Sequence, residues 1–210
     1  IDSGKYDMIL ENRSGRRLLG ALLRPMSARS LQQKSSFLEG KLGQEIASPL
    51  LTIVDDPFLE GGLGSLLYDG EGLAARRLTL IEKGKLKSFF VDTYYGRKLG
   101  MEPTTAGSSN LLFEYGDHSL EDLVKDTEKG ILVTSFIGGN SNPTTGDFSF
   151  GIIGMLVEKG EIVKPVNEMN ISGNIGDLLK RLVAVGNDPY PYSSVKIPSL
   201  RFEAVNFSGI

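Results

Sequence analysis

The longest regular pattern of apolar and polar positions lies between Ile131 and Asn174. Ile131–Ile137 is an apolar, partly β-branched run with the length of a strand. Gly138–Asp147 is polar and rich in Gly, Asn, Pro and Thr, which is typical of a shaped loop. Phe148–Val157 then predicts a second strand, which a turn at Glu158–Glu161 joins to a third. We therefore predict two strong strands separated by a long loop, and such loops commonly contact a ligand or partner.

The rest of the chain predicts short strands and short helices. Further strands are expected at Tyr6–Leu10, Leu50–Val54, Leu78–Glu82, Lys85–Val91, Leu111–Tyr115 and Val195–Phe207. Helices are expected after the capping residues Ser14, Asp92 or Thr93, Ser119 and Asn174, the last of them running to Val185. Hairpins and scattered helices favour an α+β fold with an antiparallel-rich sheet over a doubly wound sheet.

The first of these helices has a clear apolar stripe. It is predicted to begin near Gly15 and to end or bend at Pro25. Its apolar positions recur at helical spacing and should face the core: Leu18, Leu19, Leu22 and Leu23.

Composition excludes several classes of protein. The chain has 210 residues, 40% of them hydrophobic, which is enough for a sizeable core. Its net charge of −3 comes from well-mixed charges, so no nucleic-acid or anionic-membrane surface is indicated, and no membrane span or signal peptide is visible. The absence of Cys excludes disulfides, a Cys nucleophile and thiolate metal sites, and it fits a reducing cytoplasm. Because the chain begins with Ile and reads like the middle of a domain, we expect a fragment.

Three features could carry chemistry, and each also has a structural reading. The glycine-rich Gly138–Gly151 stretch lacks the Lys-Ser/Thr pair of a phosphate-binding loop and leads into a strand, so contact with a peptide or a purely structural role is favoured. Asp69 and Glu71 could orient a water or a metal, or could simply be solvated turn residues. His118, the single His, has no catalytic partner placed by the sequence and is better read as solvated or locally hydrogen-bonded.

Five segments keep their order and spacing between Leu31 and Asn206: KSSFLEGKLGQEI (Lys34–Ile46), YDGEGLAARR (Tyr68–Arg77), TYYGRKLG (Thr93–Gly100), GDFSFGIIGMLVEKGEIVKPVNEMNISGN (Gly146–Asn174) and VGNDPY (Val185–Tyr190). In these segments the chain resembles the C-terminal half of the TldD/PmbA family, and specifically its PmbA (TldE) branch. The resemblance implies an α+β fold with a curved antiparallel sheet, with residues 1–210 forming one C-terminal domain and an N-terminal domain lacking. It also implies paired cytoplasmic proteases, associated with maturation of a peptide antibiotic that targets DNA gyrase and with antitoxin breakdown.

The catalytic branch of the family carries an H-E-x-x-x-H zinc helix. Aligned through Lys34–Leu38, the two His positions and the Glu position fall on Leu19, Arg24 and Gly20. None of these can coordinate zinc as a neutral nitrogen or carboxylate ligand, and the further Cys ligand of that branch is also missing. The resemblance thus implies no metal and no catalytic residue in this chain, with zinc only in a TldD-like partner.

The expected function is that of the non-zinc subunit of a two-component metalloprotease, which holds an unfolded peptide while a TldD-like partner, or a second copy, completes the assembly. Substrate is expected to add to a sheet edge near Ile131–Ile137. The residues expected to bind it are Gly138, Gly139, Asn140, Asp147 and Ser149, with Asp69 and Glu71 as weaker candidates. Two alternatives remain open: a self-associating scaffold, and a metal-independent hydrolase that uses Ser or Thr. Neither nucleic acid nor membrane is expected as a partner.

Overall fold

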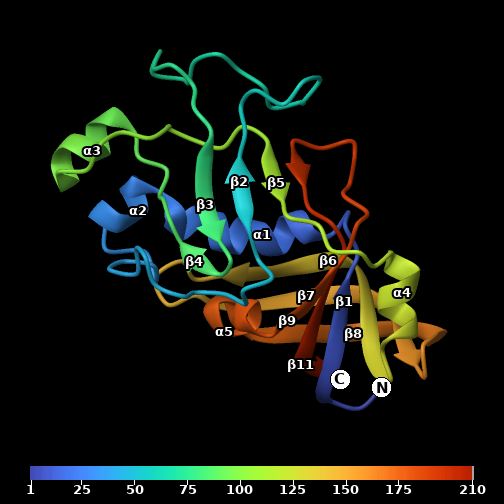
Figure 1. The fold of residues 1–210 in the computed structure, drawn as a ribbon. Coiled ribbons are helices and arrows are strands. Elements are labelled where there is room, and N and C mark those ends of the chain that lie inside the picture. The colour runs from blue at the N-terminus through green and yellow to red at the C-terminus, as the bar shows by residue number, and fades with distance from the viewer. Residues whose placement is uncertain (210) are drawn as a thin grey trace.

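The computed structural model describes residues 1–209, which form two sheets with one helix lying between them (Figure 1). The helices are α1 (Gly15–Leu23), α2 (Ala28–Gln32), α3 (Thr93–Leu99), α4 (Leu120–Lys125) and α5 (Ile175–Lys180), with a 3-10 turn, η1, at Arg24–Met26. The central helix is α1.

The larger sheet is strongly curved and closes on itself. Its strands, in spatial order, are β1 (Gly4–Leu10), β6 (Lys129–Ser141), β7 (Asp147–Glu158), β8 (Glu161–Asn174), β11 (Leu200–Gly209) and β9 (Leu182–Val185). Because β1 also pairs with β11, five of these strands form a ring. Every pairing in the sheet is antiparallel except that of β1 with β6. Such closure leaves few strand edges with unpaired backbone N–H and C=O groups, so any remaining edge is a place where another chain could pair.

The smaller sheet covers the other side of α1. Its strands, in spatial order, are β10 (Val195–Lys196), β5 (Leu111–Phe113), β2 (Ile53–Asp55), β3 (Leu78–Glu82) and β4 (Lys85–Leu86). Short strands alone would be unstable, and here they are stabilised by the apolar face of the helix beneath them.

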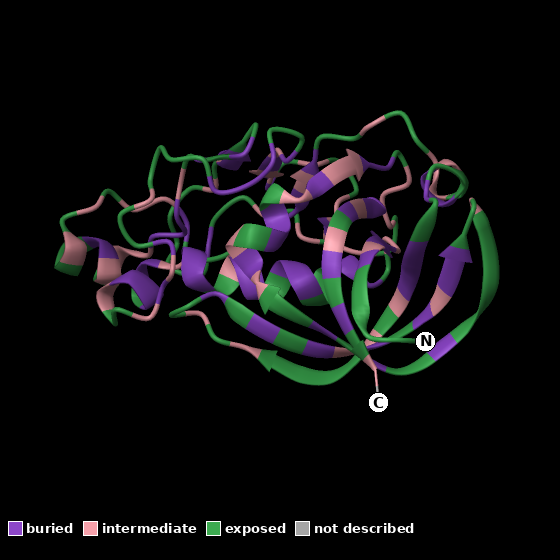
Figure 2. Ribbon diagram, turned by 90° about the horizontal axis from the view of Figure 1, so that it is seen from below, coloured by how far each residue is buried: buried purple, intermediate pink, exposed green. Residues whose placement is uncertain are grey.

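The main core lies where α1 meets both sheets. Alternate residues of β7, including Phe148 and Phe150, are buried, and Figure 2 shows buried and exposed segments alternating along the long curved strands. Leu19 and its apolar neighbours on α1 lie close to Ile53 on β2 and to Phe202 on β11. One helix face is therefore packed against side chains from both sheets.

Much of the predicted local structure is confirmed, including the α+β class and the antiparallel-rich curved sheet. Asp92, Ser119 and Asn174 cap α3, α4 and α5 by accepting hydrogen bonds from backbone N–H groups, and Ser119 forms a full capping box. The predicted cap at Ser14 is wrong: its hydroxyl donates to the Thr134 carbonyl instead. The helix predicted to run to Val185 is also wrong, because the chain after Arg181 forms β9 and pairs with β11.

The predicted loop at Gly138–Asp147 is shorter than expected. Strand β6 continues through Ser141, and β7 begins at Asp147. Gly138 and Gly139 have φ values of +59° and +75°, and the pairing register shifts between Ile137 and Asn140. The glycines thus form a bulge inside the strand and do not begin a loop. Four other predicted strands have different bounds. Leu50–Val54 is replaced by Ile53–Asp55, Lys85–Val91 by Lys85–Leu86, and Leu111–Tyr115 by Leu111–Phe113. The predicted Val195–Phe207 is divided into Val195–Lys196 and Leu200–Gly209.

The small sheet contains a buried carboxyl group, which gives a test of stability against pH. Asp55 is 1% exposed and accepts hydrogen bonds from the Ser109 backbone N–H at 2.6 Å and from its hydroxyl at 3.0 Å. Burial raises the pKa of Asp55 above its ordinary 3.8, and the two Ser109 hydrogen bonds offset this only partly. The folded state therefore binds this proton more tightly than the unfolded state, and stability is lost as the pH rises from 3.8 to the folded pKa.

Asp55→Asn keeps an acceptor oxygen and removes the titration. Between about pH 3 and pH 7, the wild type should lose stability that the variant keeps. In urea titrations, the free energy of unfolding of the variant minus that of the wild type should therefore rise with pH, by about 1.4 kcal/mol for each unit between the folded and unfolded pKa values of Asp55. A difference for Asp55→Asn that does not change with pH would contradict the expectation.

Candidate functional site

A groove of about 950 Å³ lies between the outer face of α1 and the end of β6. Its lining comes from two segments far apart in the sequence: Arg13, Ser14, Arg16, Arg17, Gly20, Ala21 and Arg24, and Thr134, Ser135, Phe136, Gly138, Gly139, Asn140, Ser141 and Phe150. The groove includes two of the three zinc-motif positions and three of the predicted binding residues.

Helix α1 is amphipathic, and its two faces have different surroundings. Leu19, at the first His position, is 6% exposed and belongs to the core. Gly20 and Arg24 lie on the other side and line the groove. Gly20 has no atom within 4 Å of where a Cβ would stand, so the groove is open at this residue.

Strand β6 has a free edge along the groove. Strand β1 pairs with β6 only from Gly130 to Val133 and ends at Leu10. Beyond Val133, within residues 1–209, no strand pairs with this side of β6, whereas β7 continues on the other side to Ser141. The edge expected near Ile131–Ile137 is therefore free only after Val133.

Arg17 connects α1 to the glycine bulge of β6. Its Nη2 donates to the carbonyl oxygens of Gly138 at 3.2 Å and Gly139 at 2.9 Å. Its guanidinium carbon also lies 5.0 Å from the centroid of the Phe150 ring, within the range of a cation–π contact. These contacts hold the bulge against the helix and fix the shape of the groove.

The other predicted strand residues lie near the groove without lining it. Ser149 is the cross-strand partner of Asn140, which does line the groove. Asp147 accepts hydrogen bonds from Asn174 Nδ2 at 3.0 Å and from Thr145 Oγ1 at 2.7 Å, and these two bonds lower the pKa of its carboxyl group. Asp147 thus organises the turn between β6 and β7.

Asp69 and Glu71 lie in a separate loop and do not act together on a common site. Burial raises the pKa of Asp69, but hydrogen bonds from the backbone N–H groups of Glu71, Leu73 and Ala106 lower it more, so the pKa lies below its ordinary value. Glu71 accepts from the Thr93 backbone N–H at 2.8 Å and from its hydroxyl at 2.6 Å, at the start of α3. Both carboxylates accept hydrogen bonds from the backbone, and Glu71 also accepts one from the Thr93 hydroxyl, which supports their structural reading.

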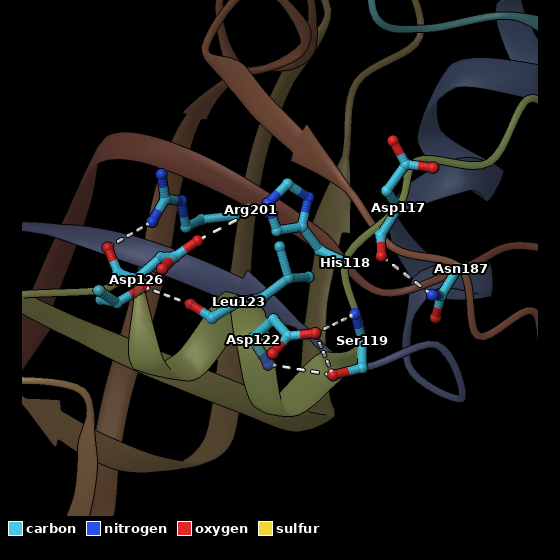
Figure 3. A network of polar contacts seen from close by, with 9 residues as sticks. Asp117, His118, Ser119, Asp122, Leu123, Asp126, Asn187 and Arg201 are labelled. Carbon is cyan, nitrogen blue, oxygen red and sulfur yellow. Dashed lines mark hydrogen bonds and ion pairs between the residues drawn. The ribbon is translucent and has the colours of Figure 1, made fainter.

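His118 belongs to a polar network that joins α4 to β11 (Figure 3). Its Nε2 lies 3.7 Å from a carboxylate oxygen of Asp126, and both side chains are about half exposed. The Asp126 backbone carbonyl accepts a 2.7 Å hydrogen bond from Arg201. His118 does not line the groove, and its half-exposed side chain agrees with the solvated reading.

Among the described residues, those that line the groove include no imidazole, thiolate or carboxylate group that could hold zinc. Leu19, Gly20 and Arg24 supply an aliphatic group, a hydrogen atom and a cation in place of the imidazoles and carboxylate of a zinc helix. Within residues 1–209 no group of three His, Asp or Glu side chains is suitably placed to bind a metal elsewhere. The residues present at the motif positions therefore do not fit zinc.

The arginines of the groove were missed by the sequence analysis, although the pattern was present. Arg13, Arg17, Gly20 and Arg24 are spaced by four, three and four residues, which places them on one face of a helix. The leucine stripe predicts only the buried face of the helix, and the arginine spacing defines the opposite face.

In the described part of the chain, no helix is long and apolar enough to cross a membrane.

The bulge of β6 provides a matched test of the groove's geometry. Gly138 has open space where a Cβ would stand, whereas a Cβ on Gly139 would overlap the Ser149 carbonyl oxygen and lie 2.7 Å from Phe150 Cα. Both residues have positive φ, so Gly138→Ala should lower the free energy of unfolding by about 1–2 kcal/mol. Gly139→Ala should lower it by about 1–3 kcal/mol more, because the clash adds to the backbone strain. Equal losses in urea unfolding would show that the close approach at Gly139 is not tight.

Comparisons with known proteins agree with the resemblance seen in the sequence. Residues 3–209 match the family described as "PmbA/TldA metallopeptidase C-terminal domain". The chain is 34% identical, over 211 aligned residues, to "Metalloprotease PmbA" of Escherichia coli O157:H7, covering 100% of this chain and 47% of that protein. It is 31% identical to "Metalloprotease TldD homolog" of Haemophilus influenzae, covering 74% of this chain and 35% of that protein.

Two solved structures have the same fold. A protein of Bacteroides thetaiotaomicron, named as a proposed modulator of DNA gyrase, is 48% identical with a TM-score of 0.98, over 100% of this chain and 48% of that one. TldE from Thermococcus kodakarensis is 29% identical with a TM-score of 0.92, over 100% of this chain and 51% of that one. The chain spans about half the length of the PmbA protein of E. coli and of both solved structures. The chain belongs to the PmbA/TldD metallopeptidase family and matches the C-terminal domain of that family.

Proposed function

We propose that this chain acts in the non-zinc, PmbA/TldE-like subunit of a two-component cytoplasmic metalloprotease. The subunit binds and orients an unfolded peptide, and a TldD-like partner supplies the zinc chemistry. The family resemblance extends the proposal to peptide-antibiotic maturation and antitoxin turnover as the kinds of process served.

One observation carries the proposal: the outer face of α1 keeps an open groove at the zinc-motif positions but has no ligand there. Gly20 and Arg24 line the groove, and Leu19 is buried in the core. A residual zinc site would need imidazole or carboxylate groups at these positions. The groove is thus better suited to holding a substrate than to activating water.

The free edge of β6 supports the substrate class. An edge strand presents backbone N–H and C=O groups that an extended peptide can pair with. In this part of β6 the carbonyls of Thr134, Gly138 and Gly139 already accept hydrogen bonds from Ser14 and Arg17, so a peptide would pair with the remaining backbone groups. The edge after Val133 runs along the groove beside Phe136 and Asn140. Strand addition here would leave alternate peptide side chains facing α1.

The division of labour can be tested by metal analysis and peptide cleavage with full-length protein. The protein purified alone should carry no stoichiometric zinc and should cleave no unfolded peptide, because the described lining of its groove has no imidazole or carboxylate ligand. Addition of a TldD-like partner should produce cleavage that a chelator abolishes. Zinc-dependent cleavage by the lone protein would overturn the proposal, and chelator-resistant cleavage would favour a Ser- or Thr-dependent hydrolase.

The role of the groove can be tested by filling it. Gly20 faces open space, and Trp has a higher helix propensity than Gly, so Gly20→Trp should fold normally while obstructing the groove. Peptide binding and partner-dependent cleavage should both fall by about tenfold or more, a loss of about 1.4 kcal/mol.

Gly70→Trp is the matched control for this substitution. Gly70 is also exposed and also has open space at its Cβ position, but it lies outside the groove. Its variant should bind and cleave as the wild type does. If both variants retain full activity, the groove has no part in proteolysis and a self-associating scaffold becomes the better account.

A further inference from the structure

We infer that the groove selects peptides rich in carboxylates. This inference rests on the proposed function and adds a substrate class to it. A second groove, of about 680 Å³, shares Arg24 with the first. The second groove also contains Arg29, so five arginines line the two grooves together: Arg13, Arg16, Arg17, Arg24 and Arg29.

No acidic residue balances these cations within the grooves. Of the described residues that line either groove, none is Asp or Glu. Arg13 lies 3.9 Å from Glu11, but no ion pair joins Arg16, Arg24 or Arg29 to a carboxylate within residues 1–209. Because the whole chain has a net charge of −3, this is a local concentration of positive charge on an acidic protein. Such a concentration attracts and orients anionic ligands.

Arginine is well suited to recognising carboxylates. Its planar guanidinium can donate two parallel hydrogen bonds to one carboxylate, and it keeps its charge at any physiological pH. Arg17 is fixed by the bulge of β6, whereas Arg16 on α1 and Arg24 at the start of η1 are exposed without such contacts to β6. A peptide on the free edge of β6 would present alternate side chains toward these two cations.

The observations favour an acidic peptide over a nucleic acid. Proteins that bind single-stranded nucleic acid combine basic grooves with exposed aromatic rings on which bases stack. Of the three phenylalanines that line the grooves, Phe150 is 2% exposed and Phe90 is 6% exposed, whereas Phe136 is half-buried with its ring against Phe150. One partly exposed ring is fewer than successive stacked bases would need. A strand edge, in contrast, recognises the peptide backbone and not a sugar-phosphate chain.

The test is fluorescence anisotropy of full-length protein with labelled peptides of alternating Thr and Glu, Thr and Gln, and Thr and Lys. The Glu peptide should bind about tenfold more tightly than the Gln peptide at low salt, and the Lys peptide should bind most weakly. Raising the ionic strength should reduce the difference, because salt screens exposed charges.

Substitution should assign the preference to the groove. The double variant Arg16→Gln with Arg24→Gln should weaken binding of the Glu peptide about tenfold and leave the Gln peptide nearly unchanged. The control is Arg97→Gln, which removes an exposed arginine from α3 outside both grooves and should leave both affinities unchanged.

Three results would overturn the inference, and they differ in what else they affect. Equal binding of the Glu and Gln peptides would remove the acidic preference and leave the proposed peptide-holding role intact. Failure of all three peptides to bind would remove both. Tighter binding of oligothymidylate than of a Glu peptide of equal charge would assign the arginines to nucleic acid.

Discussion

The structure depends on the burial of one face of α1 between two sheets. Leu18, Leu19 and Leu22 are nearly inaccessible to solvent, and burying each contributes about 1.5–3 kcal/mol. Apolar residues from both sheets surround this face, so the helix cannot rotate without exposing it. Because the inner face is fixed, the outer face is fixed as well, and Gly20 and Arg24 must face the groove. The same packing that stabilises the fold therefore sets the composition of the candidate site.

A single turn of the chain creates both the groove's free edge and its opposite wall. Strand β1 stops at Leu10, and Glu11 donates a last hydrogen bond to the Val133 carbonyl before the chain turns. The turn leads directly into α1, which lines the groove on the side opposite the unpaired end of β6. Side chains from this segment bind backbone carbonyls of β6: Ser14 binds Thr134, and Arg17 binds the glycine bulge. The edge is thus held in position by the helix while remaining unpaired by a strand.

The sequence predicted correctly those features that depend on residues close together in the chain, such as helix caps and the buried face of α1. Capping side chains at Asp92, Ser119 and Asn174 bind N–H groups a few residues away, and the apolar stripe of α1 reflects helical geometry alone. The length of β6 could not be predicted from nearby residues. Gly138 and Gly139 continue the strand because β7 pairs with it and because Arg17 binds their carbonyl oxygens, and both partners are distant in the sequence or on another element. The end of α5 was missed for the same reason, since pairing with β11 replaces the helix after Arg181. Of the site, the position of the groove was predictable from the zinc-motif alignment and the glycines, whereas its charge required the arginine spacing that the leucine pattern concealed.

The residues at the zinc-motif positions affect the charge of the groove as well as its ability to bind a metal ion. A divalent cation placed about 4 Å from one guanidinium would be repelled by roughly 8 kcal/mol at an effective dielectric constant of about 20. The neighbouring arginines would add to this cost, and no carboxylate lining the described groove would reduce it. A carboxylate with one negative charge in the same place would be attracted to the guanidinium by roughly 4 kcal/mol at the same dielectric constant. The cost of removing the carboxylate from water reduces this gain. A groove with this lining therefore discriminates between ligands by charge, and the backbone edge beside it adds a preference for extended chains. On the proposed division of labour, the partner would bring the metal and this chain would bring the contacts that hold the peptide.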